Sequence, residues 1–278
     1  MAMGMAEKAA RYRTLHDGDV FVAGGCWDAG TARLLAHAGF AALETSSAGV
    51  MFARGLPDGD GLATRDIMLE NARQVAAAVD VPVSADLENG WAATAKGVAE
   101  TIGLAGSCGI VGGSIEDTTG DRAAPIFPIE VAAERVRAAV EAAKALPFRF
   151  ALTARADQYM HGLGVLAEVI ARAQAFQAAG ADFFLAPGMS DPDEFSTLCQ
   201  SVDIPVAAIS GLSGFHPPLA EYGRLGVRRV IVGSAFARVA MSGVLAAARE
   251  VVETGRFGFA DGLMPFGELN GLFRRLAG

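Results

Sequence analysis

Short apolar stretches of strand length recur along the chain at regular intervals. They are rich in valine, isoleucine, phenylalanine and alanine, and they fit strands that are covered on both faces. The stretches span residues 19–25, 39–45, 81–87, 109–117, 148–157, 181–188, 204–210 and 227–233. The pattern therefore predicts eight buried strands.

Alanine-rich segments with helical spacing separate these stretches. Examples are TARLLAHA, MLENARQVAAAV, IEVAAERVRAAVEAAKAL and LAEVIARAQAFQAA. In HAGFAAL, AAGADFFL and RLGVRRVIV a glycine stands where the end of a helix needs a positive φ before the next strand. Alternation of eight strands with helices predicts an α/β protein with a (β/α)₈ TIM barrel fold, and a doubly wound sheet is the alternative.

The chain shows no linker and no break in composition, so we expect residues 1–278 to form a single barrel domain. Residues 255–278 lie beyond the eighth unit and predict an amphipathic helical tail. Its large apolar residues could pack on the chain's own barrel or on a neighbouring subunit: Phe257, Phe259, Phe266, Leu269 and Phe273.

Composition narrows the class of partner. Hydrophobic residues make up 52% of the chain and charged residues 19%, as in a soluble α/β enzyme. A formal charge of −8 without any Lys/Arg-rich run argues against nucleic acid or an anionic membrane surface, so a small-molecule substrate is expected.

The cysteines and the first residues indicate the compartment. Cys26, Cys108 and Cys199 are widely spaced, which suggests neither a zinc site nor a disulfide framework and fits a reducing cytoplasm. The first 18 residues contain no apolar signal segment, and no stretch is long and charge-free enough for a membrane span. We therefore expect a cytoplasmic protein.

Charged residues collect where three consecutive predicted strands end. Asp86 and Glu88 follow the third strand, Glu116 and Asp117 end the fourth, and Arg155 ends the fifth. In a barrel the carboxyl ends of the strands meet at one mouth, where active sites lie. Oxygen ligands without His or Cys suit Mg²⁺ or Mn²⁺, and a nearby arginine suits a substrate carboxylate. Any one of these acids alone is explained as well by an ordinary ion pair at the barrel mouth.

Other residue types limit the possible chemistry. A Schiff-base aldolase needs a lysine on a strand, whereas Lys8, Lys96 and Lys144 fall in the N-terminal segment or in predicted helices. His161 lies close enough to Arg155 in sequence to reach the mouth, and Cys26 is better explained as a small packing residue. No covalent imine is expected.

Several motifs in order along nearly the whole chain resemble the isocitrate lyase/phosphoenolpyruvate mutase superfamily. They are TSSAGV at 45–50, GLPD at 55–58, SADLENG at 84–90, SIED at 114–117 and TARAD at 153–157. The resemblance implies a Mg²⁺-dependent (β/α)₈ barrel that acts on 2-oxo acids or their enols. It also implies a homo-oligomer, a dimer or tetramer, in which the eighth helix is exchanged between subunits.

By position, the resemblance assigns roles to individual residues. Asp86 matches the acid that binds the metal directly and so meets the chelated substrate, while Glu88, Asp58 and Glu116 match acids that hold the waters of the metal. Arg155 matches the arginine that grips the substrate carboxylate. Asp58, Glu116 and Arg155 are thus the expected catalytic residues, and Ser46 and Ser47 match residues whose backbone N–H and hydroxyl groups receive the rest of the substrate.

Two departures from the superfamily pattern bear on function. Glu88 stands where an aspartate is usual, so its extra methylene could let it touch the metal itself. The lyase members carry a K-[KR]-C-G-H loop after the fourth strand, whereas residues 118–130 read TTGDRAAPIFPIE and contain no cysteine.

We therefore expect an enzyme that forms a metal-stabilised enolate from a small 2-oxo acid by breaking a C–C or C–P bond. Oxaloacetate decarboxylation and phosphonopyruvate hydrolysis are the leading reactions. A phosphonomutase or a (methyl)isocitrate-type lyase is the first alternative. A 2-oxo acid binding protein without turnover is an alternative of another class.

Overall fold

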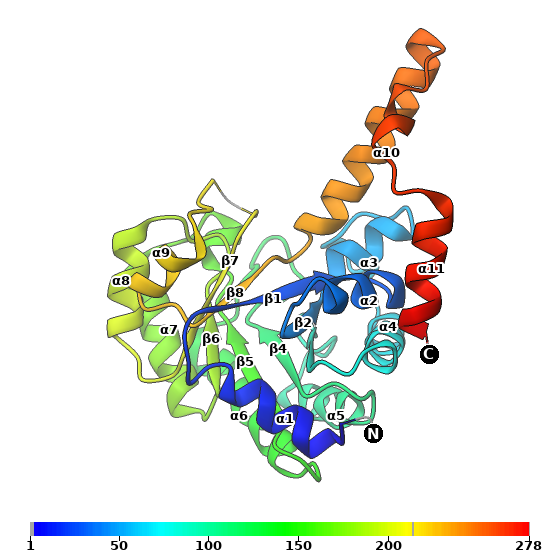
Figure 1. The fold of residues 1–278 in the computed structure, drawn as a ribbon. Helices are drawn as coiled ribbons and strands as arrows, with labels where there is room; N and C mark the ends of the chain where they lie inside the picture. The colour runs from blue at the N-terminus through cyan, green and yellow to red at the C-terminus, as the bar shows by residue number, and fades with distance from the viewer. Residues whose placement is uncertain (1–2, 213, 278) are drawn as a thin grey trace.

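The computed structural model describes residues 3–212 and 214–277, and all eight predicted strands are present in it. Every neighbouring pair of strands is parallel, and β1 pairs with β8, so the sheet closes into a barrel (Figure 1). Closure confirms the TIM barrel and excludes the doubly wound alternative. The strands are β1 (Phe21–Cys26), β2 (Ala42–Thr45), β3 (Val83–Asp86), β4 (Gly112–Glu116), β5 (Ala151–Arg155), β6 (Phe183–Leu185), β7 (Val206–Ile209) and β8 (Arg229–Ile231).

Helices follow the strands in the order that the sequence predicts. Gly39, Gly180 and Gly226 follow three of these helices with φ of 101°, 98° and 97°. This is the left-handed backbone that the sequence analysis expects of the glycines between a helix and the next strand. The α-helices of the barrel are α1 (Met5–Thr14), α2 (Ala29–His37), α3 (Ser47–Ala53), α4 (Arg65–Ala78), α5 (Ala95–Gly106), α6 (Ile129–Lys144), α7 (Leu166–Ala178), α8 (Pro192–Gln200) and α9 (Leu219–Arg224), and η1 (Gln158–His161) is a short 3₁₀ helix.

The inside of the barrel holds polar side chains as well as apolar ones. Arg229 on β8 is buried and donates hydrogen bonds to the Thr153 hydroxyl, at 2.9 Å, and to the hydroxyl of Tyr12 from α1. The ring of His16, just after α1, stacks on Phe183 with 3.8 Å between centroids. Helix α1 thus covers the end of the barrel opposite to the mouth.

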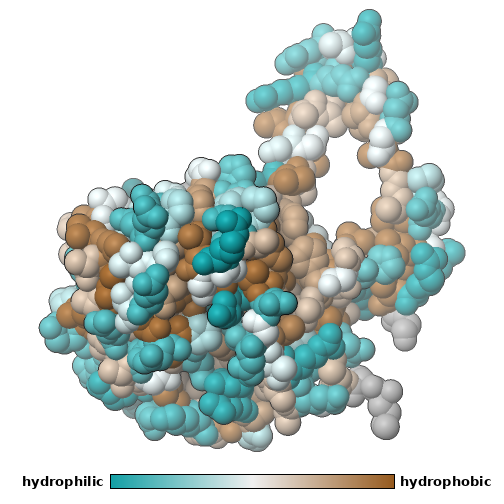
Figure 2. Space-filling model, turned by 60° about the vertical axis from the view of Figure 1, so that its left-hand side comes forward, coloured by the Kyte–Doolittle hydropathy of each residue, from teal (hydrophilic) through white to brown (hydrophobic). Residues whose placement is uncertain are grey.

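The chain beyond β8 leaves the barrel as an arm. Helix α10 (Ala235–Thr254) projects outward, the chain turns at η2 (Gly258–Gly262), and α11 (Phe266–Ala277) runs back (Figure 1). Apolar side chains are interspersed with polar ones along the arm (Figure 2). Val252 is 86% exposed and Phe266 83%, and the other exposed apolar side chains are Val239, Met241, Val244, Leu245, Phe257, Phe259, Leu263, Met264 and Leu269.

The exposed arm bears on two of the sequence predictions. Four of the five apolar residues named for the tail are exposed, and Phe273 is half-buried. Exchange of this arm between subunits stays a prediction.

No helix in residues 3–212 and 214–277 is long and apolar enough to cross a bilayer.

Candidate active site

A cavity of about 1080 Å³ opens at the carboxyl ends of the strands. Such a mouth is where (β/α)₈ barrels place their chemistry. Residues far apart in the sequence meet there because parallel strands end on the same side of the barrel. Each predicted site residue lines this cavity: Ser46, Ser47, Asp58, Asp86, Glu88, Glu116 and Arg155.

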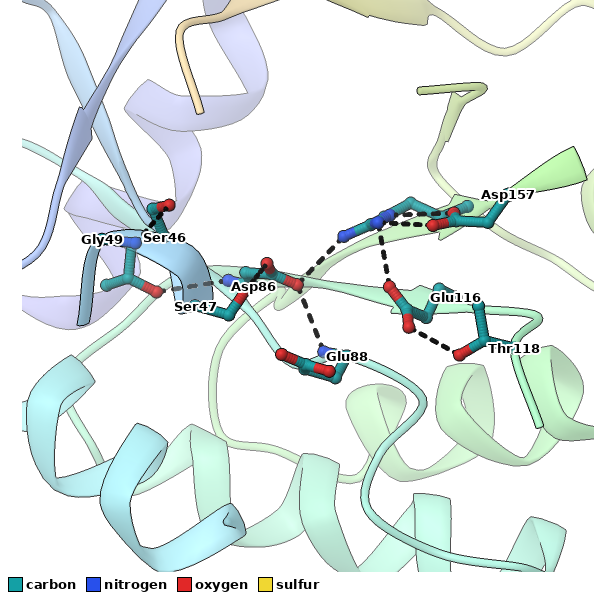
Figure 3. A network of polar contacts seen from close by, with 10 residues as sticks. Ser46, Ser47, Gly49, Asp86, Glu88, Glu116, Thr118 and Asp157 are labelled. Carbon is teal, nitrogen blue, oxygen red and sulfur yellow. Dashed lines mark hydrogen bonds and ion pairs between the residues drawn. The ribbon is translucent and has the colours of Figure 1, made fainter. Parts of the chain in front are cut away.

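Asp86, the last residue of β3, lies at the centre of the polar contacts in the cavity (Figure 3). Its Oδ2 accepts a hydrogen bond from the Ser47 hydroxyl at 2.9 Å. Its Oδ1 accepts from the Arg155 Nη1, at 3.1 Å, and from the backbone N–H of Glu88, at 3.2 Å. The segment after β3, the end of β5 and the start of α3 therefore orient one carboxylate.

Arg155, the last residue of β5, joins three acids. Besides Asp86, its guanidinium contacts Glu116 at 2.9 Å and Asp157 at 2.7 Å. Burial opposes the charge of Arg155, but Asp157, Glu116 and Asp86 outweigh this effect and raise its pKa well above its ordinary value. Thr118 in turn donates to Glu116 Oε1 at 2.6 Å. The guanidinium is held in one orientation before any substrate arrives.

The acids of the cavity outnumber the cations that contact them. In the described part of the chain, Arg155 is the one cation within salt-bridge distance of Asp86, Glu116 and Asp157, and no cation lies within that distance of Asp58 or Glu88. Burial and then the charges of Asp86 and Asp58 raise the pKa of Glu88 from 4.5 to about 8. Burial is also the largest cause of the raised pKa values of Asp58 and Glu116. A further cation would relieve this excess of negative charge.

The donor set fits a hard divalent cation, because all its ligating atoms are carboxylate or hydroxyl oxygens. Among residues 3–212 and 214–277, no three His, Cys, Asp or Glu side chains converge so as to hold an ion together. That Asp86, Glu88 and Glu116 hold a metal ion, with Asp86 in direct contact, remains a prediction.

Ser46 and Ser47 differ in what they have free for a ligand. The Ser46 hydroxyl accepts from the Gly49 N–H at 3.2 Å and so caps α3, and the Ser46 N–H donates to the Cys26 carbonyl at 3.0 Å. Ser47 is the first residue of α3, so intrahelical bonds do not use its N–H. Of the two predicted substrate-binding serines, Ser47 is therefore the one whose backbone N–H can donate a hydrogen bond to a ligand.

Asp117 and Asp157, to which the sequence analysis gave no role, support the site. Asp117 Oδ1 accepts the backbone N–H of Asp157 at 2.9 Å, and its Oδ2 accepts from Arg172 at 3.0 Å. Burial raises the pKa of Asp117 to about 6. The alternation of a strand was the available signal, because Glu116 points into the barrel and the next residue must point outward. Asp157, two residues after Arg155, lies on the same side as Arg155, pairs with it at 2.7 Å and lines the cavity.

The remaining candidates near the mouth have smaller roles. The thiol of Cys26 is buried, burial raises its pKa, and it donates to the Glu44 carbonyl, so its packing role fits the structure. His161 lines the cavity, as its distance in sequence from Arg155 suggested. Arg122 from the loop after β4 pairs with Asp60 at 2.6 Å, and both line the cavity.

Comparison with known proteins places this site in a family. The profile of the phosphoenolpyruvate phosphomutase family matches residues 12–252. The solved structure of a protein classed only as a lyase/mutase, from Burkholderia cenocepacia J2315, is 47% identical with a TM-score of 0.94, covering 97% of this chain and 96% of that chain.

Curated relatives point the same way. An uncharacterized protein of Mycobacterium tuberculosis is 32% identical over 222 residues, 79% of this chain and 80% of its own length. An oxaloacetate decarboxylase of Pseudomonas entomophila is 27% identical over 227 residues, 80% of this chain and 76% of its own. With the closed barrel and the acids at its mouth, these matches show that the chain belongs to the phosphoenolpyruvate mutase/isocitrate lyase superfamily.

Proposed function

We propose that the protein is a Mg²⁺-dependent enzyme that acts on a small 2-oxo acid and breaks a bond to C3. The leading reactions are decarboxylation of oxaloacetate and hydrolysis of phosphonopyruvate. The observation that carries the proposal is the set of five acids around one arginine at the barrel mouth. Similarity to an oxaloacetate decarboxylase supports the choice of substrate class.

Asp86, Glu88 and Glu116 are the residues that would hold the cation, and Mn²⁺ satisfies the same oxygen ligands. When bound, the cation supplies Lewis-acid stabilisation of the negative charge that develops on the keto oxygen of the substrate. Ser47 keeps Asp86 oriented through the bond between its hydroxyl and Oδ2. Glu88 adds a second carboxylate. The backbone N–H of Glu88 also donates a hydrogen bond to Asp86 Oδ1.

Substrate binding falls to Arg155 and to the start of α3. Arg155 lines the cavity, and a planar guanidinium suits a substrate carboxylate. The N–H of Ser47 is a donor for the other end of the substrate, at a helix N-terminus that favours negative charge. Asp157 and Glu116 hold the arginine so that little order has to be gained on binding.

Proton transfer is assigned to Asp58. Burial and the charge of Asp86 raise its pKa, so its carboxyl group can hold a proton more readily than an exposed aspartate. In decarboxylation the electrons of the broken C–C bond remain on the substrate as an enolate while CO₂ leaves. A proton at C3, from Asp58 or from solvent, completes the reaction.

The second candidate is a phosphonomutase or a (methyl)isocitrate-type lyase. The matched family is itself named for a phosphomutase, which favours the former. A lyase needs a positioned acid or base for the leaving fragment, and residues 118–130 contain Asp121, Arg122 and Glu130 but no thiol. A protein that binds 2-oxo acids without turnover would keep the same cavity.

Steady-state assays on oxaloacetate, phosphonopyruvate and methylisocitrate, each with and without Mg²⁺, test the proposal. We expect pyruvate from one of the first two, dependence on Mg²⁺, and loss of that activity in Asp86→Ala with an unchanged circular dichroism spectrum. Conversion of phosphonopyruvate to phosphoenolpyruvate would favour the mutase instead. Cleavage of methylisocitrate at about 1 per second or faster would contradict the proposal, and binding without turnover would favour the binding protein.

We also propose that the arm formed by α10, η2 and α11 joins subunits into a dimer or tetramer. A monomer rarely leaves so many large apolar side chains in water on one projecting element. A second copy of the chain would bury them.

A further inference from the structure

The segment after β3 has a backbone that residues other than glycine rarely adopt. Glu88 has a φ of 47° and Trp91 a φ of 49°, with Gly90 at 76° between them. In this left-handed region a residue with a Cβ is strained. Such a backbone persists only where surrounding contacts hold it.

Hydrogen bonds from four directions hold residues 88–91. The Glu88 carbonyl accepts from the Glu116 N–H at 2.9 Å, and the Thr101 hydroxyl donates to the Gly90 carbonyl at 2.8 Å. The Asn89 side chain accepts from the Trp91 N–H at 3.0 Å and donates to the Thr118 carbonyl at 3.2 Å. The backbone carbonyl of Asn89 accepts a hydrogen bond from a side chain that lies outside the barrel mouth.

That side chain is Arg135 of α6, whose Nη2 donates to the Asn89 carbonyl at 2.5 Å. Arg135 is only 2% exposed, and no acid in the described part of the chain lies within salt-bridge distance of it. Its guanidinium lies over the Phe127 ring at 4.5 Å, while Nε and Nη1 have no hydrogen-bond partner among residues 3–212 and 214–277. Burial accordingly lowers its pKa.

A buried arginine without an acidic partner lowers stability, because taking a charge out of water is unfavourable. Ala132, Val136 and Ala139 on the buried side of the same helix are all apolar. A long apolar side chain at position 135 would fill the space without the cost of the charge. What the guanidinium adds is the bond to Asn89 and the contact with Phe127.

Phe127 links Arg135 to the second loop of the site. Its N–H donates to the Asp117 carbonyl at 2.9 Å, and its own carbonyl accepts from Arg172 at 2.9 Å. Arg135 therefore contacts both the segment that carries Glu88 and the loop that follows Glu116. These are the two strand ends on either side of the β3–β4 contact.

We propose that Arg135 is a positioning residue for Glu88. It holds the Asn89 carbonyl, and so keeps the left-handed backbone that directs the Glu88 carboxylate into the cavity beside Asp86. The inference rests on the proposed function in one respect, that the oriented Glu88 carboxylate helps to hold a divalent cation. The effect on the backbone itself is independent of any cation.

The test compares Arg135→Met, which keeps a long unbranched side chain and removes the donors, with Arg137→Met, which changes an exposed arginine on the same helix. In metal-free protein we expect amide hydrogen exchange of a peptide covering residues 87–92 to be at least about tenfold faster in Arg135→Met, and unchanged in the control. Binding of Mn²⁺, followed by electron paramagnetic resonance without substrate, should weaken by about 10-fold or more in Arg135→Met alone. Arg135→Lys keeps one donor and should restore most of both properties.

Unchanged exchange at residues 87–92 in folded Arg135→Met would overturn the proposal, and so would a lysine variant no better than the methionine variant. Arg135→Gln replaces the methionine variant if that one does not fold. Failure of both to fold would also overturn it, because Arg135 would then serve the stability of the whole barrel. Wild-type protein that binds no Mn²⁺ would instead contradict the proposed function, and the exchange measurement would still decide the role of Arg135.

Discussion

Replacing Glu88 with glutamine tests the electrostatics of the site without any substrate. Glutamine keeps the size of the side chain and removes its charge. The pKa of Glu88 in the folded protein is about 8, above its ordinary value of 4.5, because of burial and then the charges of Asp86 and Asp58. Ionising Glu88 therefore opposes folding, so the free energy of unfolding should fall as the pH rises from 4.5 to 8 and then level off.

The size of the effect follows from these two pKa values. A difference of one pKa unit corresponds to about 1.36 kcal/mol, so the difference between 4.5 and about 8 corresponds to roughly 5 kcal/mol. At pH 8.5 without metal, we expect Glu88→Gln to be more stable than the wild type by about 2 to 5 kcal/mol. Near pH 4.5 the gap should shrink below about 1 kcal/mol, because both side chains are then largely uncharged in the folded state.

Urea unfolding followed by circular dichroism, at one protein concentration, between pH 4.5 and 8.5 and in the presence of a chelator, measures the gap. Glu134→Gln is the matched control, because Glu134 is exposed on α6, and its effect should stay within about 0.5 kcal/mol. Added Mg²⁺ should stabilise the wild type more than Glu88→Gln, since a bound cation offsets the charge of Glu88.

Equal or lower stability of Glu88→Gln at pH 8.5 in metal-free buffer would refute this reasoning. A gap that does not change between pH 4.5 and 8.5 would do the same, because it would show that the charge is not its cause.

Three further predictions follow from other parts of the chain. Arg155→Lys keeps the charge, but a lysine cannot contact Asp86, Glu116 and Asp157 together, so kcat/KM for the 2-oxo acid should fall at least about tenfold. An unchanged kcat/KM in steady-state assays would count against the role of Arg155. Burial and then Arg229 lower the pKa of His16 from 6.5 to about 3, so the wild type should lose about 2 kcal/mol of unfolding free energy between pH 6.5 and 5, and His16→Phe should lose that much less in the same urea titrations. If the wild type and His16→Phe lose the same free energy of unfolding between pH 6.5 and 5, His16 is not the source of the acid sensitivity. Aspartates in place of Val252 and Phe266 together should reduce the molar mass from that of a dimer or tetramer toward a monomer in light scattering after gel filtration, whereas a monomeric wild type at micromolar concentration would argue against the arm as a subunit contact.

The sequence by itself determined the architecture of the barrel. Eight apolar stretches separated by helical segments leave few other arrangements, and the glycines before the strands mark the same boundaries that the structure shows. It also determined that Asp86, Glu116 and Arg155 meet, since the carboxyl ends of consecutive parallel strands share one side of a barrel. Topology alone supplies this information, so no knowledge of side-chain contacts was needed.

Only the tertiary structure decided how these side chains are connected. That Arg155 contacts three acids depends on side-chain rotamers and on the register of β4 and β5. The left-handed backbone of Glu88 depends on Arg135, which is 47 residues away from Glu88 in the chain and is read from the sequence as one more residue of a helix. The reason is physical: patterns along the chain reveal which face of an element is buried, whereas hydrogen bonds and ion pairs between distant residues are set only when the elements pack together.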